Sequence, residues 1–158
     1  MRFPFTISSI PTFQFLAAPF ASAAARLFPK AVFRMSANPT VLVVDDVDAT
    51  RQGLAQLLRL LGYDAREASN GDEALERLRE DPRICVVVLD LLMPGTDGYS
   101  FRAQQLRDPA IAHIPAIVFT GRELQLDEVT EILQVADVFQ KPVSADALCE
   151  AVSRYCHQ

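Results

Sequence analysis

The stretch VVVLDLLMPGTDG, residues 86–98, decides the fold. It begins with four apolar residues, three of them β-branched, and then places Asp90 shortly before a proline and glycine turn. An apolar run of this kind is typical of a strand that is buried on both faces of a parallel sheet. Because a buried carboxylate without a partner is energetically costly, Asp90 is predicted to be either a helix cap or part of a site.

A second segment has the same design. Residues 40–44, TVLVV, form an uninterrupted apolar run that ends in Asp45 and Asp46. Apolar residues then recur at helical spacing up to Gly62, which favours an amphipathic helix that ends there. This helical stripe consists of Leu54, Leu57, Leu58 and Leu61. The pattern therefore predicts a buried strand followed by a helix.

The alternation continues to the end of the chain. Further strands are expected at residues 63–68, 84–89, 114–119 and 136–140. The helices that follow them are marked by stripes that we expect to face inward: Ala74, Leu75 and Leu78; Tyr99, Ala103 and Leu106; Leu126, Val129, Ile132 and Leu133; and Ala145, Leu148, Val152 and Tyr155. Five strands that alternate with five helices predict an α/β fold with right-handed crossovers and a parallel sheet covered on both faces.

Composition and charge restrict the function. Half of the 158 residues are hydrophobic, which is enough for the core of one domain. Residues 45–158 carry all 20 acidic residues but only 11 of the 15 Lys and Arg residues, so this part has a net charge of −9. Non-specific binding to nucleic acid needs a basic surface, so a nucleic-acid partner is not expected.

The cysteines indicate a cytoplasmic protein. Cys85, Cys149 and Cys156 are odd in number and have no CxxC spacing. We therefore expect reduced thiols rather than a disulfide framework or a zinc site. Cys85 is expected in the core, and Cys149 and Cys156 on one face of the last helix, where packing is the simplest role.

Residues 1–38 differ from the rest and are predicted to be a disordered extension before a domain at residues 39–158. They contain four Lys or Arg residues, no acidic residue, and no sustained helical or strand period. Three origins compete: a secretory signal, an organellar transit peptide, or an over-extended start with translation beginning at Met35. The third is preferred because the domain resembles a cytosolic protein and Met35 stands just before the first strand. The segment is too interrupted by proline for a membrane span.

Unexplained polar residues follow four of the predicted strands, and the carboxyl ends of parallel strands form the binding edge of such a sheet. They are Asp45, Asp46, Asp90, Thr120 and Lys141. Carboxylates suit Mg²⁺, a lysine can pair with a phosphate, and a threonine hydroxyl can donate to a phosphoryl oxygen. These residues predict a site where Asp90 attacks phosphorus while Mg²⁺ and Lys141 neutralise the transferring group.

Each of these residues also has an ordinary structural interpretation. Asp45 and Asp46 could be N-caps of the first helix, and Asp97 is expected to be the cap of the helix that follows it. Thr120 alone would be a strand-end residue, and Lys141 alone a solvated surface lysine. Only their joint occurrence at one edge of the sheet favours a site.

Residues 40–155 resemble the receiver domain of bacterial two-component response regulators. The resemblance rests on four segments that occur in order, each at the end of a predicted strand: VLVVDD (41–46), VVVLDLLMPGTDGY (86–99), IVFTG (117–121) and DVFQKPV (137–143). It implies a flavodoxin-like, doubly wound (βα)5 fold whose five-stranded parallel sheet has the order 2-1-3-4-5.

The resemblance also implies residue roles. Asp90 would accept a phosphoryl group from a phosphohistidine on a sensor histidine kinase or a histidine phosphotransfer protein. Asp46 and Asp90 would bind Mg²⁺ directly, Asp45 would bind it mainly through water, and the carbonyl of Leu92 would be a further ligand. Thr120 and Lys141 would contact the phosphoryl group, and Pro142 would follow a cis peptide bond. Beyond self-phosphorylation and autodephosphorylation, no enzymatic activity is implied.

The sequence departs from the family at one position that bears on signalling. Three residues before Lys141, where many members carry the Tyr or Phe that rotates on phosphorylation, it has Val138, with Phe139 beside it. This departure does not affect the phosphorylation chemistry. It puts in doubt the usual coupling between the threonine and the aromatic residue.

The predicted function is that of a single-domain response regulator that acts on an unknown protein target or in a phosphorelay, since no output domain is expected after residue 158. One alternative is a receiver-like scaffold that binds partners without phosphorylation. A metal-dependent phosphohydrolase is disfavoured, because aspartate-based phosphatases need a second carboxylate where this chain has Leu92.

Overall fold

The computed structural model of the chain describes residues 38–93, 97–121 and 126–156. The predictions made for residues 1–37 lie outside these ranges. Within them, five strands form one sheet in which every neighbouring pair is parallel, and the strand order is β2-β1-β3-β4-β5. The strands are β1 (Thr40–Val44), β2 (Asp64–Ala68), β3 (Ile84–Asp90), β4 (Ala116–Thr120) and β5 (Asp137–Gln140). The predicted fold class and strand order are confirmed.

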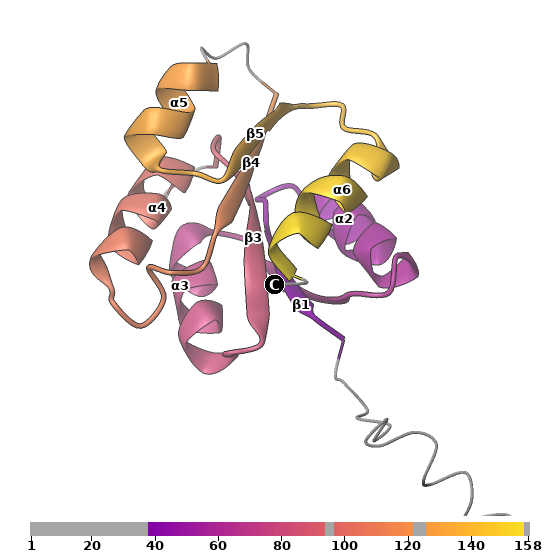
Figure 1. Cartoon of the computed structure of the whole chain (residues 1–158), viewed down its shortest axis with the longest axis horizontal. Helices are drawn as coiled ribbons and strands as arrows, with labels where there is room; N and C mark the ends of the chain where they lie inside the picture. Colours follow the sequence, from indigo (N-terminus) through magenta and orange to yellow (C-terminus); the bar gives the residue numbers. More distant parts are fainter. Residues whose placement is uncertain (1–37, 94–96, 122–125, 157–158) are drawn as a thin grey trace, which may run out of the picture. The chain divides into compact units, whose positions relative to one another are not determined.

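Helices cover both faces of the sheet (Figure 1). They are α2 (Asp48–Leu60), α3 (Gly71–Glu80), α4 (Gly98–Arg107), α5 (Leu126–Leu133) and α6 (Ala145–Cys156). Helices α2 and α6 lie on one face, and α3, α4 and α5 lie on the other. None of the helices in the described ranges has the length and apolar character of a membrane span.

Burial on both faces of the central strands explains their composition. All five residues of β1 are buried, and Val86, Val87, Val88 and Leu89 of β3 are at most 1% exposed. Alternate residues enter different apolar clusters, because successive side chains of a strand point to opposite faces. Val87 and Leu89 join the cluster under α3, α4 and α5, and Val86 and Val88 join the cluster under α2 and α6.

Helix capping separates the acidic residues into two kinds. Asp97 is the N-cap of α4, as predicted, and its side chain accepts a hydrogen bond from the N–H of Ser100 at 2.7 Å. The N-cap of α2, however, is Val47, which makes no side-chain capping bond. Asp45 and Asp46 therefore do not cap this helix, and their presence needs another explanation.

The face that α4 buries is not the predicted one. Tyr99 and Ala103 are exposed and Leu106 is half-buried, so the inward stripe predicted for this helix is wrong. The helix instead buries Phe101 together with two polar residues, Arg102 and Gln105. The apolar pattern misled because polar side chains can be buried when all of their hydrogen bonds are made within the protein.

Arg102 and Gln105 tie three backbone segments together. Arg102 donates to the carbonyls of Leu133 (3.0 Å) and Gln134 (2.7 Å) at the end of α5, and to the side chain of Gln105 (2.7 Å). The amide of Gln105 donates to the carbonyls of Ile111 and Ile114 in the loop before β4. Burial lowers the pKa of Arg102 from its ordinary value. These hydrogen bonds hold the carboxyl end of α5 to α4.

The stripe predicted for α3 is confirmed, since Ala74, Leu75 and Leu78 are all buried. The stripes of the remaining helices were right in part. Val129 and Leu133 of α5 are buried, but Ile132 is 72% exposed, and the side chain of Leu126 lies outside the described residues. In α6, Leu148 and Val152 are buried and Tyr155 is half-buried, whereas Ala145 is exposed. In α2, Leu58 is buried, Leu54 and Leu57 are partly buried against the core, and Leu61 is 37% exposed. The stripes identified the helices better than their exact inward faces.

The cysteine prediction is wrong. Cys85 and Cys156 form a disulfide with a Cα–Cα distance of 5.2 Å, and Cys149 is the free cysteine. The two partners are 71 residues apart, one near the start of β3 and the other at the end of α6. Sequence spacing could not indicate this pair, because the fold alone brings the end of α6 over the start of β3.

Replacing Arg102 with methionine should lower the free energy of unfolding by about 2–4 kcal/mol, because buried carbonyls at the end of α5 lose their donor. Urea denaturation followed by circular dichroism measures this change. Arg107→Met, at an exposed position on the same helix, is the control and should change stability by less than about 0.5 kcal/mol. Equal effects of the two substitutions would contradict the role assigned to Arg102.

Thiol counting tests the disulfide. Labelling of the denatured protein with iodoacetamide should modify one cysteine before reduction and three after it. Cys156→Ser should lower the free energy of unfolding by about 2–4 kcal/mol, because the open chain gains entropy when a long loop is no longer closed. Cys149→Ser is the matched control on the same helix and should have little effect. Three labelled cysteines without reduction would contradict the pairing.

Candidate functional site

The candidate site lies at the carboxyl ends of four strands. Asp45 and Asp46 follow β1, Asp90 is the last residue of β3, Thr120 is the last residue of β4, and Lys141 follows β5 directly. The central position of β1 and β3 in the sheet brings these ends together. Sequence reasoning predicted this shared edge, since parallel strands end on the same side.

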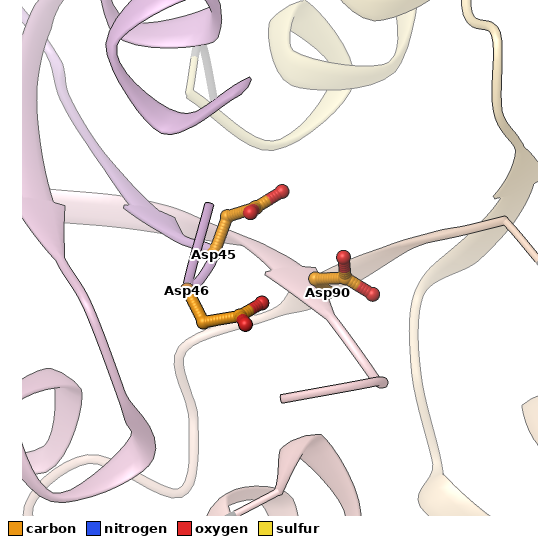
Figure 2. Close-up of side chains that lie close together, drawn as sticks. All are labelled: Asp45, Asp46 and Asp90. Carbon is orange, nitrogen blue, oxygen red and sulfur yellow. The ribbon is translucent and has the colours of Figure 1, made fainter. Parts of the chain in front are cut away.

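Three carboxylates form the centre of the site. Asp45, Asp46 and Asp90 each offer an oxygen, and these oxygens all lie within 4.8 Å of one another. Figure 2 shows the side chains of Asp45 and Asp46 after β1 and that of Asp90 across from them on β3. Asp45 is buried, and Asp46 and Asp90 are half-buried, so water screens their mutual repulsion incompletely.

Lys141 balances part of this charge. Its Nζ atom lies 2.8 Å from Oδ2 of Asp45 and 2.7 Å from Oδ2 of Asp90. Burial alone would lower the pKa of the Lys141 ammonium group, but the two carboxylates outweigh burial and raise that pKa above its ordinary value. Lys141 therefore carries a positive charge between the carboxylates of Asp45 and Asp90. The Lys141–Pro142 peptide bond is cis, as the resemblance predicted.

Backbone contacts fix the acidic residues in place. Oδ1 of Asp45 accepts a hydrogen bond from the N–H of Val47 at 2.8 Å, and its own N–H donates to the carbonyl of Ala68 at 3.2 Å. Oδ1 of Asp90 accepts from the N–H of Leu92 at 3.0 Å. Each of these two carboxylates thus has one oxygen on a backbone amide and the other on Lys141.

Thr120 completes the set from β4. The residue is fully buried, and its carbonyl accepts a hydrogen bond from the backbone N–H of Lys141 at 2.8 Å. This backbone bond joins the end of β4 to the residue after β5. The structure therefore brings together the side chains of Asp45, Asp46, Asp90 and Lys141 and joins Thr120 to this set through its backbone. Leu92 lies in the loop that follows β3.

Gly98 and Arg51 also support the site, although the sequence did not point to either. A Cβ atom at Gly98 would lie 2.6 Å from the carbonyl oxygen of Asp90, so only glycine allows α4 to start this close to β3. Arg51 in α2 donates to the carbonyl of Asp45 at 2.8 Å. A glycine beside the predicted cap Asp97 was a usable signal, whereas an arginine within a helix carries none.

Val138, which stands where many receiver domains carry a rotating Tyr or Phe, and its neighbour Phe139 point to opposite faces of the sheet. Val138 packs against the cluster under α3, α4 and α5. Phe139 points to the other face and stacks on Phe119, with ring centroids 5.3 Å apart. Phe139 therefore does not supply an aromatic ring on the side of α5, and the departure noted in the sequence holds in the structure.

The arrangement fits a divalent cation and a phosphoryl group. Three carboxylates and one ammonium group leave two formal negative charges in a small, half-buried volume. The three carboxylates offer hard oxygen donors, which Mg²⁺ prefers. Lys141 can pair with a phosphoryl oxygen once a cation balances the charge of the carboxylates.

Comparisons with known proteins agree with this geometry. Residues 41–153 match the response regulator receiver domain. The protein PilH of Pseudomonas aeruginosa is 29% identical over 114 residues, which are 72% of this chain and 93% of that protein. The probable transcriptional regulator ycf27 of Porphyridium aerugineum is 38% identical over 110 residues, covering 68% of this chain but only 44% of that regulator.

Solved structures give the same result. The response regulator receiver protein of Pseudomonas putida superposes with a TM-score of 0.69 at 31% identity, and the match covers 75% of this chain and 98% of that one. Sequence, fold and the placement of the acidic residues thus lead to one conclusion. The chain belongs to the response regulator receiver family of two-component signalling.

Proposed function

We propose that the protein is a single-domain response regulator that accepts a phosphoryl group on Asp90 from a phosphohistidine. The observation that carries this proposal is the contact of one lysine, Lys141, with carboxylates from two neighbouring strands, Asp45 and Asp90. Such an arrangement places carboxylates that can hold a cation beside a lysine that can pair with a phosphoryl oxygen. Membership of the receiver family supports the same activity.

Asp90 is the proposed nucleophile. It stands on the central strand β3, and its side chain is only 11% exposed, so little solvent competes at its oxygens. One carboxylate oxygen attacks phosphorus while the bond from phosphorus to the donor imidazole nitrogen breaks, and the electron pair stays on that nitrogen. The amide of Leu92 holds Oδ1, which fixes the plane of the carboxylate before the reaction.

Asp45, Asp46, Asp90 and the carbonyl of Leu92 are proposed to hold Mg²⁺. The close approach of the three carboxylates supports this assignment. When bound, the ion supplies the positive charge that offsets the oxygens of the transferring group. Asp46 and Asp90 would hold the ion directly and Asp45 mainly through water, and Lys141 would pair with the phosphoryl oxygens.

Lys141 and Thr120 are proposed to stabilise the phosphorylated state. The Lys141 ammonium already lies 2.7 Å from Asp90, so a small movement brings it to a phosphoryl oxygen on that residue. The Thr120 hydroxyl, at the end of the neighbouring strand β4, would donate a second hydrogen bond. Both contacts depend on the phosphoryl group and can report its presence to the rest of the domain.

The partners follow from this chemistry. A sensor histidine kinase or a histidine phosphotransfer protein would supply the phosphoryl group in the cytoplasm, and a separate protein would bind the phosphorylated form or take the group onward. The net negative charge of residues 45–158 favours such protein partners over nucleic acid.

Acetyl phosphate with Mg²⁺ should add the mass of one phosphoryl group to the protein in intact-mass spectrometry. The adduct should require Mg²⁺ and be absent from Asp90→Asn. Asp97→Asn is the matched control, because it changes a nearby aspartate whose contact is with the helix α4. This variant should retain the adduct.

The possible results separate the two functions considered. A missing adduct in the folded wild type, under conditions that label another receiver, would overturn the proposal and favour a scaffold that binds partners without phosphorylation. An adduct that persists in Asp90→Asn would show that another residue is the acceptor.

Lys141→Met should slow labelling by acetyl phosphate by on the order of 10²-fold, because the charge on the transferring group loses its fixed cation. Lys141→Arg keeps the charge but replaces a compact ammonium with a planar group, so an intermediate rate is expected. Time courses of the phosphorylated fraction measure both rates. Equal rates for the methionine variant and the wild type would exclude this role for Lys141.

A further inference from the structure

Arg51 connects the start of helix α2 to the acidic residues after β1. Its side chain is only 11% exposed. The Nη1 atom donates to the backbone carbonyl of Asp45 at 2.8 Å, while the Nη2 atom pairs with Asp48. The Nε atom lies 3.7 Å from a carboxylate oxygen of Glu67 on β2. The guanidinium group therefore joins β1, β2 and α2 directly behind the candidate site.

The carbonyl that Arg51 holds belongs to the peptide unit between Asp45 and Asp46. A peptide unit is planar, so fixing its oxygen also fixes the direction in which the Cα atom of Asp46 leaves the strand. The same backbone is held on the other side of Asp45 by the bond of its N–H to Ala68. Arg51 can therefore orient the Asp46 carboxylate without touching it.

The charge of Arg51 is already balanced. Asp48 and Glu67 both lie close to its guanidinium group, and neither belongs to the carboxylate cluster of the site. Replacing Arg51 with a neutral residue would leave these two acids without this cation. By charge alone, the site would then attract a divalent cation more strongly. If Arg51 instead acts by orienting Asp46, its replacement should weaken the binding of a divalent cation.

We propose that Arg51 is a positioning residue that orients Asp46 and so sets the affinity of the site for Mg²⁺. This inference rests on the proposed function of the acidic site. It adds a residue that affects Mg²⁺ binding without being one of the proposed ligands. The guanidinium group would act on the ion indirectly, through its contact with the backbone carbonyl of Asp45.

The control is Arg59 on the same helix. Arg59 pairs with the other oxygen of Glu67 at 3.0 Å and donates to the carbonyl of Ala65. Its side chain is 51% exposed, and within the part of the chain that the structure describes it makes no hydrogen bond to Asp45 or Asp46. Arg59→Met removes the same charge from the same helix and the same partner carboxylate. Both substitutions therefore remove a cation next to Glu67, and only Arg51→Met also removes the contacts with the Asp45 carbonyl and with Asp48.

Calorimetric titration of the full chain with MgCl₂ tests the inference. Arg51→Met should raise the dissociation constant by about 10-fold or more, as loss of a residue that orients a ligand does. Arg59→Met should leave the dissociation constant unchanged or slightly lower. In acetyl phosphate labelling, the Mg²⁺ concentration for half the maximal rate should rise by the same factor in Arg51→Met, with little change in the rate at saturating Mg²⁺.

Circular dichroism first establishes that each variant is folded. If Arg51→Met does not fold, Arg51→Lys takes its place, and weaker Mg²⁺ binding is again expected, because one ammonium group pairs with Asp48 in preference to the neutral carbonyl of Asp45. Unchanged or tighter Mg²⁺ binding in the folded variant would overturn the inference. Absence of Mg²⁺ binding and phosphorylation in the wild type would instead overturn the proposed function, and the inference with it.

Discussion

The contact of the Lys141 ammonium group with two carboxylates is the interaction on which the candidate site depends. It joins residues that are 96 and 51 positions apart in the sequence, and it does so at the ends of β1 and β3. Without a cation between them, Asp45 and Asp90 would repel each other in a poorly hydrated space. The packing of the buried strands nevertheless holds these two carboxylates close together, whether or not their charges are balanced. The site therefore keeps a net negative charge that a bound cation would offset.

Much of the fold could be predicted from the sequence, because it depends on local patterns. The continuous apolar runs at residues 40–44 and 86–89 identify strands buried on both faces, and the helical stripes between them identify crossovers. The positions of Asp90 and Lys141 at strand ends then place them on one edge. The strand order, by contrast, came from the resemblance to receiver domains, since alternation alone does not fix it.

The larger errors and omissions involve contacts between separate elements of the fold. Helix α4 buries Arg102 because carbonyls at the end of another helix accept its hydrogen bonds, and no local pattern shows this. The pairing of Cys85 with Cys156 depends on where α6 ends over the sheet. Arg51 supports the site through a backbone oxygen, which every residue possesses. Buried polar contacts, disulfide pairing and backbone contacts that support a site can therefore be identified only from the three-dimensional structure.

The disulfide gives the domain an uneven covalent topology. A bond between Cys85 and Cys156 closes a ring that contains Asp90, Thr120 and Lys141, while Asp45 and Asp46 stand on the open part of the chain. A single backbone cut inside the ring leaves one covalent molecule, whereas a cut between Asp46 and Cys85 separates two of the carboxylates from the rest. In the oxidised protein, the part of the site that carries Asp90, Thr120 and Lys141 therefore belongs to a cyclic unit. After a cut between Asp46 and Cys85, only hydrogen bonds, ion pairs and packing would hold the segment with Asp45 and Asp46 to it.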